Sequence, residues 1–263
     1  MSDALYIPDG DRFVSTELTR GPWDPSAQHG GPPSALIARA IERLAPDDLA
    51  LVRLTVEIMR PVPIVPLTVA TDVIRAGRRV QVVDAALRDG DDIVCRARGI
   101  RMRVAEVPLP DTVRPDPAPT PPSDSMESSV PFDSGSVALN THGVDLREAS
   151  GTLLAAGPAA VWIRLRQPLV AGEELSGAQR AVCAADFGNG MSWALPFDRY
   201  VFVNTDLTVH LHRQPVGEWI CVDARTVASP TGVGLTTTML SDTSASVGSA
   251  TQTLFVDQRG GAA

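Results

Sequence analysis

A short stretch that begins at Asp206 carries polar side chains at every second position. Polar and apolar residues alternate there, as in a strand with one buried face, so the polar ones share a face. They are Asp206, Thr208, His210 and His212. Two histidines without a clear third ligand are weak evidence for a metal site. We interpret them as part of a polar strand face and expect no metal.

Asp206 belongs to a set of three side-chain types that can activate water. A carboxylate can take a proton from a water molecule that a hydroxyl and a carboxamide hold in place. Thr226 and Gln252 lie on two later strand-like segments of the same half of the chain. Spacing alone does not single out these three residues from other polar strand residues.

Residues 21–44 offer different chemistry, at the start of a predicted helix. Apolar residues recur there with the period of one helix face. Pro32 and Pro33 suit the first turn of a helix, where a missing N–H is no loss. Gly30 and Gly31 let the backbone approach a ligand closely, and free N–H groups at a helix start can polarise a carbonyl or hold an anion. The alternative is an ordinary buried helix after a tight turn.

The elements that must position these residues form two similar series. We expect a helix at 33–45 and then strands at 51–59, 67–75, 79–88 and 92–104. A strand at 160–165, a helix at 173–187 and strands at 200–212, 219–227, 232–241 and 247–256 follow. Residues 106–134 are rich in proline, serine and acid, which is typical of a link between two halves. Helices packed on antiparallel strands indicate an α+β fold.

The two halves also repeat each other in sequence. LTVEIMRPV begins at Leu54 and LTVHLHRQPV at Leu207, an offset of 153. Leu87 and Asp89 recur at Leu240 and Asp242 with the same offset. The repeat predicts duplication of one folding unit.

The composition excludes several classes of protein. The chain has 263 residues, of which 44% are hydrophobic, and a formal charge of −8, which argues against nucleic acid as a partner. Three widely spaced cysteines fit a reducing cytoplasm and give no zinc spacing. We read no signal peptide and no membrane span, and therefore expect a cytoplasmic protein. The motifs of serine hydrolases, P-loop proteins, dinucleotide-binding proteins and zinc peptidases are missing, and we expect no cofactor.

Three segments resemble the first half of the acyl-CoA thioesterase II family: HGGPPSALIARAIE, LTVEIMRPVP and IRAGRRVQVVDAALRDGDDIVCRARG. The second half is similar too, in TDLTVHLHR, DARTVAS and SATQTLFV. The resemblance implies a double hotdog, in which two long helices are each wrapped by an antiparallel sheet. We expect an N-terminal hotdog at 1–104, a proline-rich linker at 105–157 and a C-terminal hotdog at 158–258.

The resemblance also implies an activity and a site. The reaction would be hydrolysis of acyl-CoA thioesters by an activated water, without a covalent intermediate. Asp206 would be the base, and Thr226 and Gln252 would orient the water. The N–H of Gly30 or Gly31 would stabilise the oxyanion.

Further residues complete the implied substrate site. We place His29 beside Gly30 there, as a capping or packing residue and not as a base. Coenzyme A is anionic, so a local basic patch is needed. One candidate is Arg75, Arg78 and Arg79, and the other is Arg96, Arg98, Arg101 and Arg103. A solvated strand edge explains either group equally well.

Two other functions stay open. One is a non-catalytic acyl-CoA or lipid-binding protein with the same fold. The other, which we disfavour, is an enoyl-thioester hydratase, because the nearest match to its motif, residues 185–190, lacks the required Pro and His. By analogy with other hotdog proteins we expect a homo-oligomer.

Overall fold

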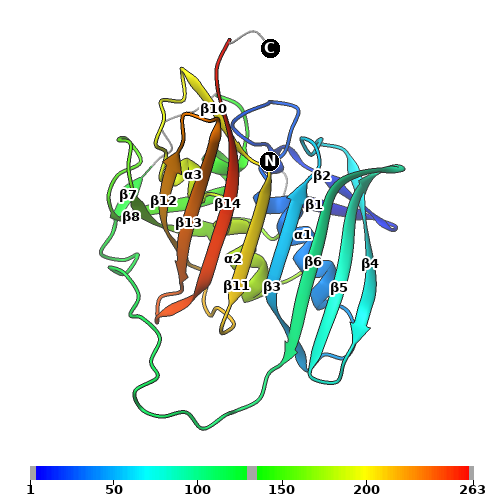
Figure 1. Cartoon of the computed structure of the whole chain (residues 1–263). Helices are drawn as coiled ribbons and strands as arrows, with labels where there is room; N and C mark the ends of the chain where they lie inside the picture. Colours follow the sequence, from blue (N-terminus) through cyan, green and yellow to red (C-terminus); the bar gives the residue numbers. More distant parts are fainter. Residues whose placement is uncertain (1–3, 129–134, 261–263) are drawn as a thin grey trace.

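The computed structural model describes residues 4–128 and 135–260, which form two helix-and-sheet units side by side (Figure 1). The N-terminal unit contains β1 (Tyr6–Asp9), β2 (Arg12–Ser15), the 3-10 turn η1 (Glu17–Thr19), α1 (Gly31–Glu42), β3 (Leu49–Ile58), β4 (Pro66–Ala76), β5 (Val80–Asp89) and β6 (Asp92–Arg103). The C-terminal unit contains β7 (Met126–Ser128), the helical turn η2 (Leu139–Gly143), β8 (Val144–Ser150), β9 (Ala159–Leu165), α2 (Gly177–Ala185), α3 (Gly188–Met191), β10 (Tyr200–Asn204), β11 (Asp206–Leu211), β12 (Ile220–Ala228), β13 (Val233–Ser241) and β14 (Ser246–Gln258).

The strands of both units join in one antiparallel sheet. Its order is β1-β2-β4-β5-β6-β3-β11-β14-β13-β12-β9-β8-β7, with β10 also paired to β14. The units meet where β3 pairs with β11, and α1 packs against α2 on one side of the sheet (Figure 1). The expected α+β double hotdog is confirmed. None of the helices in the described residues is long and apolar enough to cross a membrane.

The predicted duplication appears as an approximate two-fold axis between β3 and β11. Thr55 and Thr208, which are 153 residues apart, face each other across this pair, and their hydroxyl oxygens are 3.2 Å apart. β5 and β13 also start 153 residues apart, at Val80 and Val233. The offset found in the sequence therefore relates these elements of the two units.

Helix α1 is buried along most of its length because small and branched apolar residues cover its inner side. Leu36, Ile37 and Ile41 are fully buried, and burying each such side chain stabilises the fold by roughly 1.5–3 kcal/mol. Gly99 on β6 lets α1 approach the sheet closely, since a Cβ there would lie 2.9 Å from Cδ1 of Ile41. As predicted, Pro32 lies in the first turn of the helix.

The predicted linker at 105–157 contains regular structure at its end. β7 and β8 lie within it, and β8 pairs with β9, so the C-terminal sheet begins before residue 158. The preceding chain runs past the lower ends of the strands from β6 to β7 (Figure 1). In this stretch the carbonyl of Thr120 accepts from the indole N–H of Trp162. Residues 129–134 of the predicted linker lie outside the described residues.

The expected strand at 200–212 is divided in two at Thr205. β10 pairs Asn204 with Leu254 of β14, whereas β11 pairs Thr208 with Thr251, so the two registers differ by one residue. A shift of one residue changes which side chains face the core. Asn204 consequently points to the helix-covered side, although strict alternation would have placed it on the outer face.

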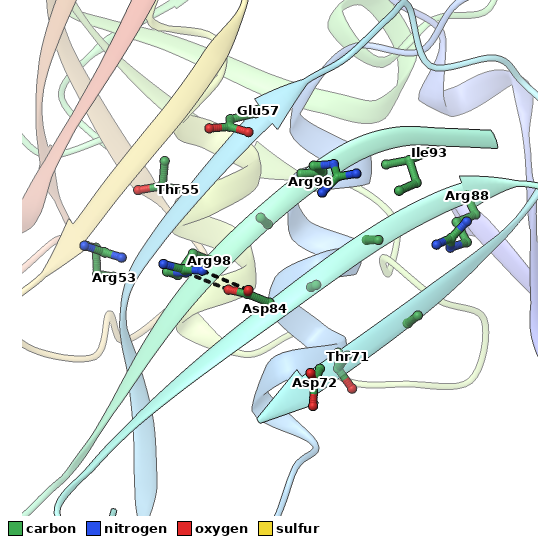
Figure 2. Close-up of a pocket in the computed structure, with 14 residues that line it drawn as sticks. Arg53, Thr55, Glu57, Thr71, Asp72, Asp84, Arg88, Ile93, Arg96 and Arg98 are labelled. Carbon is green, nitrogen blue, oxygen red and sulfur yellow. Dashed lines mark hydrogen bonds and ion pairs between the residues drawn. The ribbon is translucent and has the colours of Figure 1, made fainter. Parts of the chain in front are cut away.

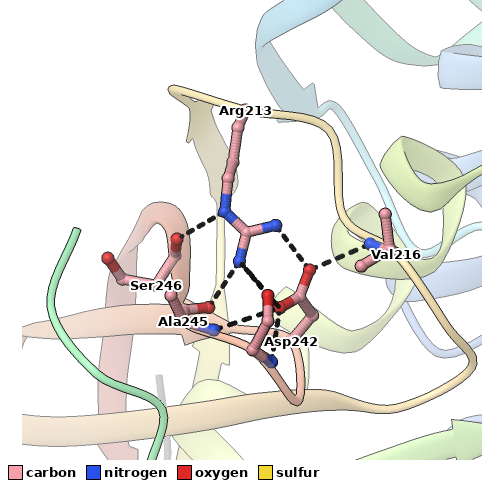
Figure 3. Close-up of polar contacts among 6 residues, drawn as sticks. Arg213, Val216, Asp242, Ala245 and Ser246 are labelled. Carbon is pink, nitrogen blue, oxygen red and sulfur yellow. Dashed lines mark hydrogen bonds and ion pairs between the residues drawn. The ribbon is translucent and has the colours of Figure 1, made fainter. Parts of the chain in front are cut away.

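An ion-pair network anchors the loop that follows β11 (Figure 3). Asp242, whose side chain is fully buried, accepts hydrogen bonds from the guanidinium of Arg213 at 2.6 and 2.7 Å. It also accepts from the backbone N–H groups of Val216 and Ser244. Arg213, one of the residues that carried the family resemblance, is therefore structural.

Candidate active site

A cavity of about 280 Å³ lies where the start of α1 meets the end of α2. Its walls are largely apolar and come from both units. They include Trp23, Ile58, Val62, Phe187, Met191 and Phe197. The polar groups on the cavity are fewer and include His29, Gly30, Arg60, Asp186, Asn189 and Asn204. A mostly apolar cavity with a few convergent polar groups is the usual form of a ligand site.

Asp186 is the central polar group of this cavity. It caps the C-terminal end of α2 and is only 3% exposed. Its Oδ2 lies 2.8 Å from Nδ1 of His29, and its Oδ1 accepts from Nδ2 of Asn204 at 2.8 Å and from Nε2 of Gln252 at 3.3 Å. A buried carboxylate requires such donors, because burying an unpaired charge is costly. The described residues contain no cluster of three His, Cys, Asp or Glu side chains suited to a metal ion.

His29 supports the carboxylate from the N-terminal unit. Its Nδ1 is 2.8 Å from Asp186 and 3.1 Å from the backbone nitrogen of Gly31. An ionised carboxylate only accepts, so Nδ1–H donates to Asp186 in that state, and Nδ1 accepts from Gly31 N–H only in the other tautomer. The imidazole also packs on the ring of Phe187 with centroids 4.3 Å apart. His29 thus orients the acid, close to the packing role expected from the sequence.

Gly30 brings backbone directly against the carboxylate. A Cβ at this position would lie 2.8 Å from Oδ2 of Asp186, so only glycine fits without a shift. Pro32 and Pro33 have no N–H, and the Gly31 N–H points to His29. Within the described part of the chain, no acceptor engages the Gly30 N–H. Gly30 lines the cavity and Gly31 does not, so the Gly30 N–H is the candidate oxyanion donor at the helix start.

Gln252 is buried behind Asp186 and its amide has one clear orientation. Its Oε1 accepts from the backbone N–H of Asn189 at 3.1 Å, which leaves Nε2 to donate to Asp186. Gly188 makes room for this amide, because a Cβ there would lie 3.0 Å from Oε1. The short helix α3 and β14 together hold the side chain in place.

The structure brings Gln252 and the helix start together but not the other predicted catalytic residues. Asp206 faces the outer side of the sheet, where its Oδ1 accepts from the N–H of Thr253 at 2.7 Å. Gln252, at the neighbouring position of β14, faces the helices. Thr226 shares that inner side but bonds to Ser192 and Thr236, and it does not line the cavity.

The predicted phosphate-binding arginines also lie away from this cavity. Arg75, Arg78 and Arg79 surround a separate hollow of about 540 Å³ next to Pro46, beyond the C-terminal end of α1. The 12 residues of α1, which starts at the cavity, span about 18 Å. Arg60 is the arginine that lines the cavity itself.

The second predicted arginine group is divided among different surroundings. Arg96 and Arg98 border an open hollow of about 870 Å³ on the outer face of the sheet, where Arg98 pairs with Asp84 (Figure 2). Arg101 is fully buried and donates to Gln81 and to carbonyl groups. This hollow is larger than the cavity, but it is open to solvent, and Arg98 and Asp84 within it pair with each other. We therefore place the chemistry in the cavity.

Sequence reasoning missed Asp186 and Asn204. Asp186 lies in the segment compared with the hydratase motif, at the end of a predicted helix, and its contact with the start of α1 is a tertiary feature. Asn204 was hidden by the register shift at Thr205. Sequence order gives no direct signal for either.

Comparison with known proteins supports the fold and identifies the family. The family model for the acyl-CoA thioesterase N-terminal domain matches residues 19–102, and that for the C-terminal domain matches residues 110–256. No curated protein matches the sequence.

Several solved structures share the architecture at low identity. A hot dog fold protein from Alicyclobacillus acidocaldarius is 15% identical with a TM-score of 0.75, covering 97% of each chain. The tesB protein of Mycobacterium avium subs paratuberculosis is 17% identical, with a TM-score of 0.69 over 94% of this chain and 92% of that chain. An acyl-CoA thioesterase II from Mycobacterium marinum is 13% identical, with a TM-score of 0.64 over 90% and 92%. With both domain models matched, the chain belongs to the acyl-CoA thioesterase family.

Proposed function

We propose that this protein hydrolyses acyl-CoA thioesters to a carboxylic acid and coenzyme A, with Asp186 as the general base. The observation that carries the proposal is a buried carboxylate, held by three side-chain donors, beside a free helix-start N–H on an apolar cavity. The family to which the chain belongs supports the same reaction class.

Each step follows from the positions of these groups. Asp186 takes a proton from a water as the water oxygen attacks the thioester carbonyl, and Asn204 and Gln252 hold the carboxylate in place. The Gly30 N–H donates to the oxyanion, a contact worth about 3 kcal/mol of the barrier. The C–S bond then breaks and the proton passes to the thiolate sulfur. No covalent enzyme intermediate forms.

Several residues have supporting roles in this proposal. Arg60 lines the cavity, and its guanidinium pairs with the exposed carboxylate of Asp92 at 2.8 Å. A phosphate of coenzyme A would take the place of this exposed partner. The hydroxyl of Thr226 bonds to that of Thr236, and Thr236 is the neighbour of Gln252 on the adjacent strand, so Thr226 supports the strand pair that carries Gln252. The cytoplasmic location and the homo-oligomer stay predictions from the sequence.

Thiol release from a panel of acyl-CoAs tests the proposal. We expect release by the wild type and a loss of at least about 1,000-fold in kcat for Asp186→Asn, which keeps the shape but removes the base. Asp206→Asn is the matched control, because that carboxylate lies on the outer face, and we expect it to keep wild-type kcat within about threefold.

Two results would contradict this assignment. Loss of release in Asp206→Asn but not in Asp186→Asn would return the base to the outer face of the sheet. Saturable acyl-CoA binding with no release from any substrate would favour the non-catalytic binding protein.

A further inference from the structure

We propose that the cavity accepts compact acyl groups that carry an aromatic ring, in preference to long linear fatty acyl chains. The inference rests on the proposed function for the reaction, but it concerns which acyl group the cavity holds. It is carried by the composition, size and anchoring of the cavity wall.

Aromatic residues concentrate around this cavity. The whole chain has four Trp, two Tyr and six Phe residues. Trp23, Phe187 and Phe197 line the cavity, and Trp193 and Phe202 pack directly on Phe197, with ring centroids 5.7 and 4.7 Å away. Aromatic side chains favour other rings, in tilted or edge-to-face contacts at 4.5–7 Å between centroids. The wall therefore offers ring faces and edges to an aromatic guest.

The volume limits the guest to a compact group. A cavity of about 150 Å³ is enough to hold benzene, and drug-sized ligands occupy about 300–1,000 Å³. At about 280 Å³ this cavity matches one ring, a short connection and the thioester carbonyl more closely than a long chain.

The part of the wall formed by Trp23 and Phe197 is fixed from three parts of the chain. Trp23 packs on Phe197 at 5.4 Å and edge-on to Phe202 at 5.0 Å. The guanidinium of Arg259, near the C-terminus, lies 5.5 Å from the Trp23 ring centroid and donates to the carbonyl of Phe197 at 2.6 Å. Arg259 also donates through its backbone N–H to Arg199. A wall tied down in this way does not open easily for a longer chain.

The contacts of His29 further restrict the acyl group. His29 packs on Phe187 at the same time as it contacts Asp186, so the aromatic wall begins next to the catalytic carboxylate. When zero or one carbon separates the ring from the thioester carbonyl, the ring can lie against the aromatic wall while the carbonyl lies beside Asp186. Benzoyl and phenylacetyl thioesters have this form.

Hydrolysis and binding are measured separately, so that failure of the specificity and failure of the reaction are distinguishable. We expect kcat/KM for phenylacetyl-CoA to exceed that for decanoyl-CoA by at least about tenfold. Calorimetry with the non-hydrolysable thioether analogues of both compounds is expected to give the same order of affinity. Equal or better performance of the decanoyl compounds in both measurements overturns the inference. A preference in binding without any hydrolysis supports it and refutes the proposed reaction alone.

Two tryptophan variants locate the selectivity. Trp23→Ala removes part of the wall, and we expect the phenylacetyl-to-decanoyl affinity ratio to fall by at least about tenfold. Trp219→Ala is the control, because Trp219 lies beside Arg147 and Arg164 and is absent from the cavity lining. Trp23→Phe, which keeps a ring, is expected to retain most of the preference. An unchanged ratio in a folded Trp23→Ala protein overturns the assigned wall.

Discussion

The oxygen lone pairs of Asp186 indicate where the attacking water binds. A carboxylate has about four lone-pair positions. Asn204 and Gln252 use both on Oδ1, and His29 uses one on Oδ2. The remaining position is on Oδ2, the oxygen nearest to the place where a Gly30 side chain would begin. The base and the oxyanion donor thus approach the same point in the cavity.

Gly30→Ala tests this arrangement at the scale of one methyl group. Its Cβ would lie 2.8 and 2.9 Å from the two oxygens of Asp186, so the carboxylate must move. Displacement of a catalytic group by about 1 Å costs on the order of 100-fold in rate. We therefore expect kcat/KM to fall about 100-fold while the protein stays folded, measured by thiol release and circular dichroism.

Gly190→Ala provides the comparison for that variant. Gly190 also borders the cavity, but a Cβ there would meet no atom within 4 Å. We expect its kcat/KM to remain within about threefold of wild type. Equal losses in the two alanine variants would mean that the contact with Asp186 is not what matters at Gly30.

At the scale of elements, hydrophobic period and turn chemistry made most strands predictable. The hairpin between β5 and β6 turns at Gly90, which has a positive φ of 58°, and an Asp-Gly pair is typical of such turns. The helix expected at 33–45 runs from Gly31 to Glu42, so the prolines located its start to within two residues. The site was less predictable, because one extra residue at Thr205 makes Asn204 face the helix-covered side of the sheet while Asp206 faces the outer side. The alternation of polar and apolar residues cannot reveal this shift, because the shift depends on how β10 and β11 pair with β14.

The Arg213–Asp242 network gives a pH-dependent prediction for the β13–β14 turn. Burial alone would raise the pKa of Asp242, but Arg213, Ser244 and the Val216 N–H lower it below its usual range. A carboxyl whose pKa is lower in the folded state stabilises the protein above its unfolded pKa of about 3.9, and loses that contribution as pH falls towards the folded pKa. Asp242→Asn leaves Arg213 unpaired, so we expect a loss of about 3 kcal/mol in unfolding free energy at pH 7.

Urea unfolding at several pH values measures this contribution. The difference between wild type and Asp242→Asn is expected to be constant from pH 7 to about pH 5 and to shrink below about pH 4. Asp89→Asn is the control, because Asp89 holds the equivalent position 153 residues earlier and is exposed. A difference that grows on acidification would contradict the assigned ion pair.

At the scale of the whole molecule, the two units share one core and one site. The main hydrophobic cluster contains buried residues of both units, and β3 pairs with β11 without a gap in the sheet. His29 and Gly30 come from the first unit, and Asp186 and Gln252 from the second. Neither half of the chain therefore completes this site alone.

This sharing predicts that the chain unfolds in one cooperative transition. Calorimetry should give one peak, with equal calorimetric and van't Hoff enthalpies. The guanidinium of Arg39 on α1 pairs with Glu173, which precedes α2, so the ion pair links the units. We expect Glu173→Gln to cost about 2 kcal/mol and to lower Tm by about 4–8 °C, moving the single peak without splitting it. Glu218→Gln removes a mostly exposed carboxylate and should shift Tm by less than about 2 °C. Two separate peaks, of which only one moves in Glu173→Gln, would show instead that each unit folds on its own core.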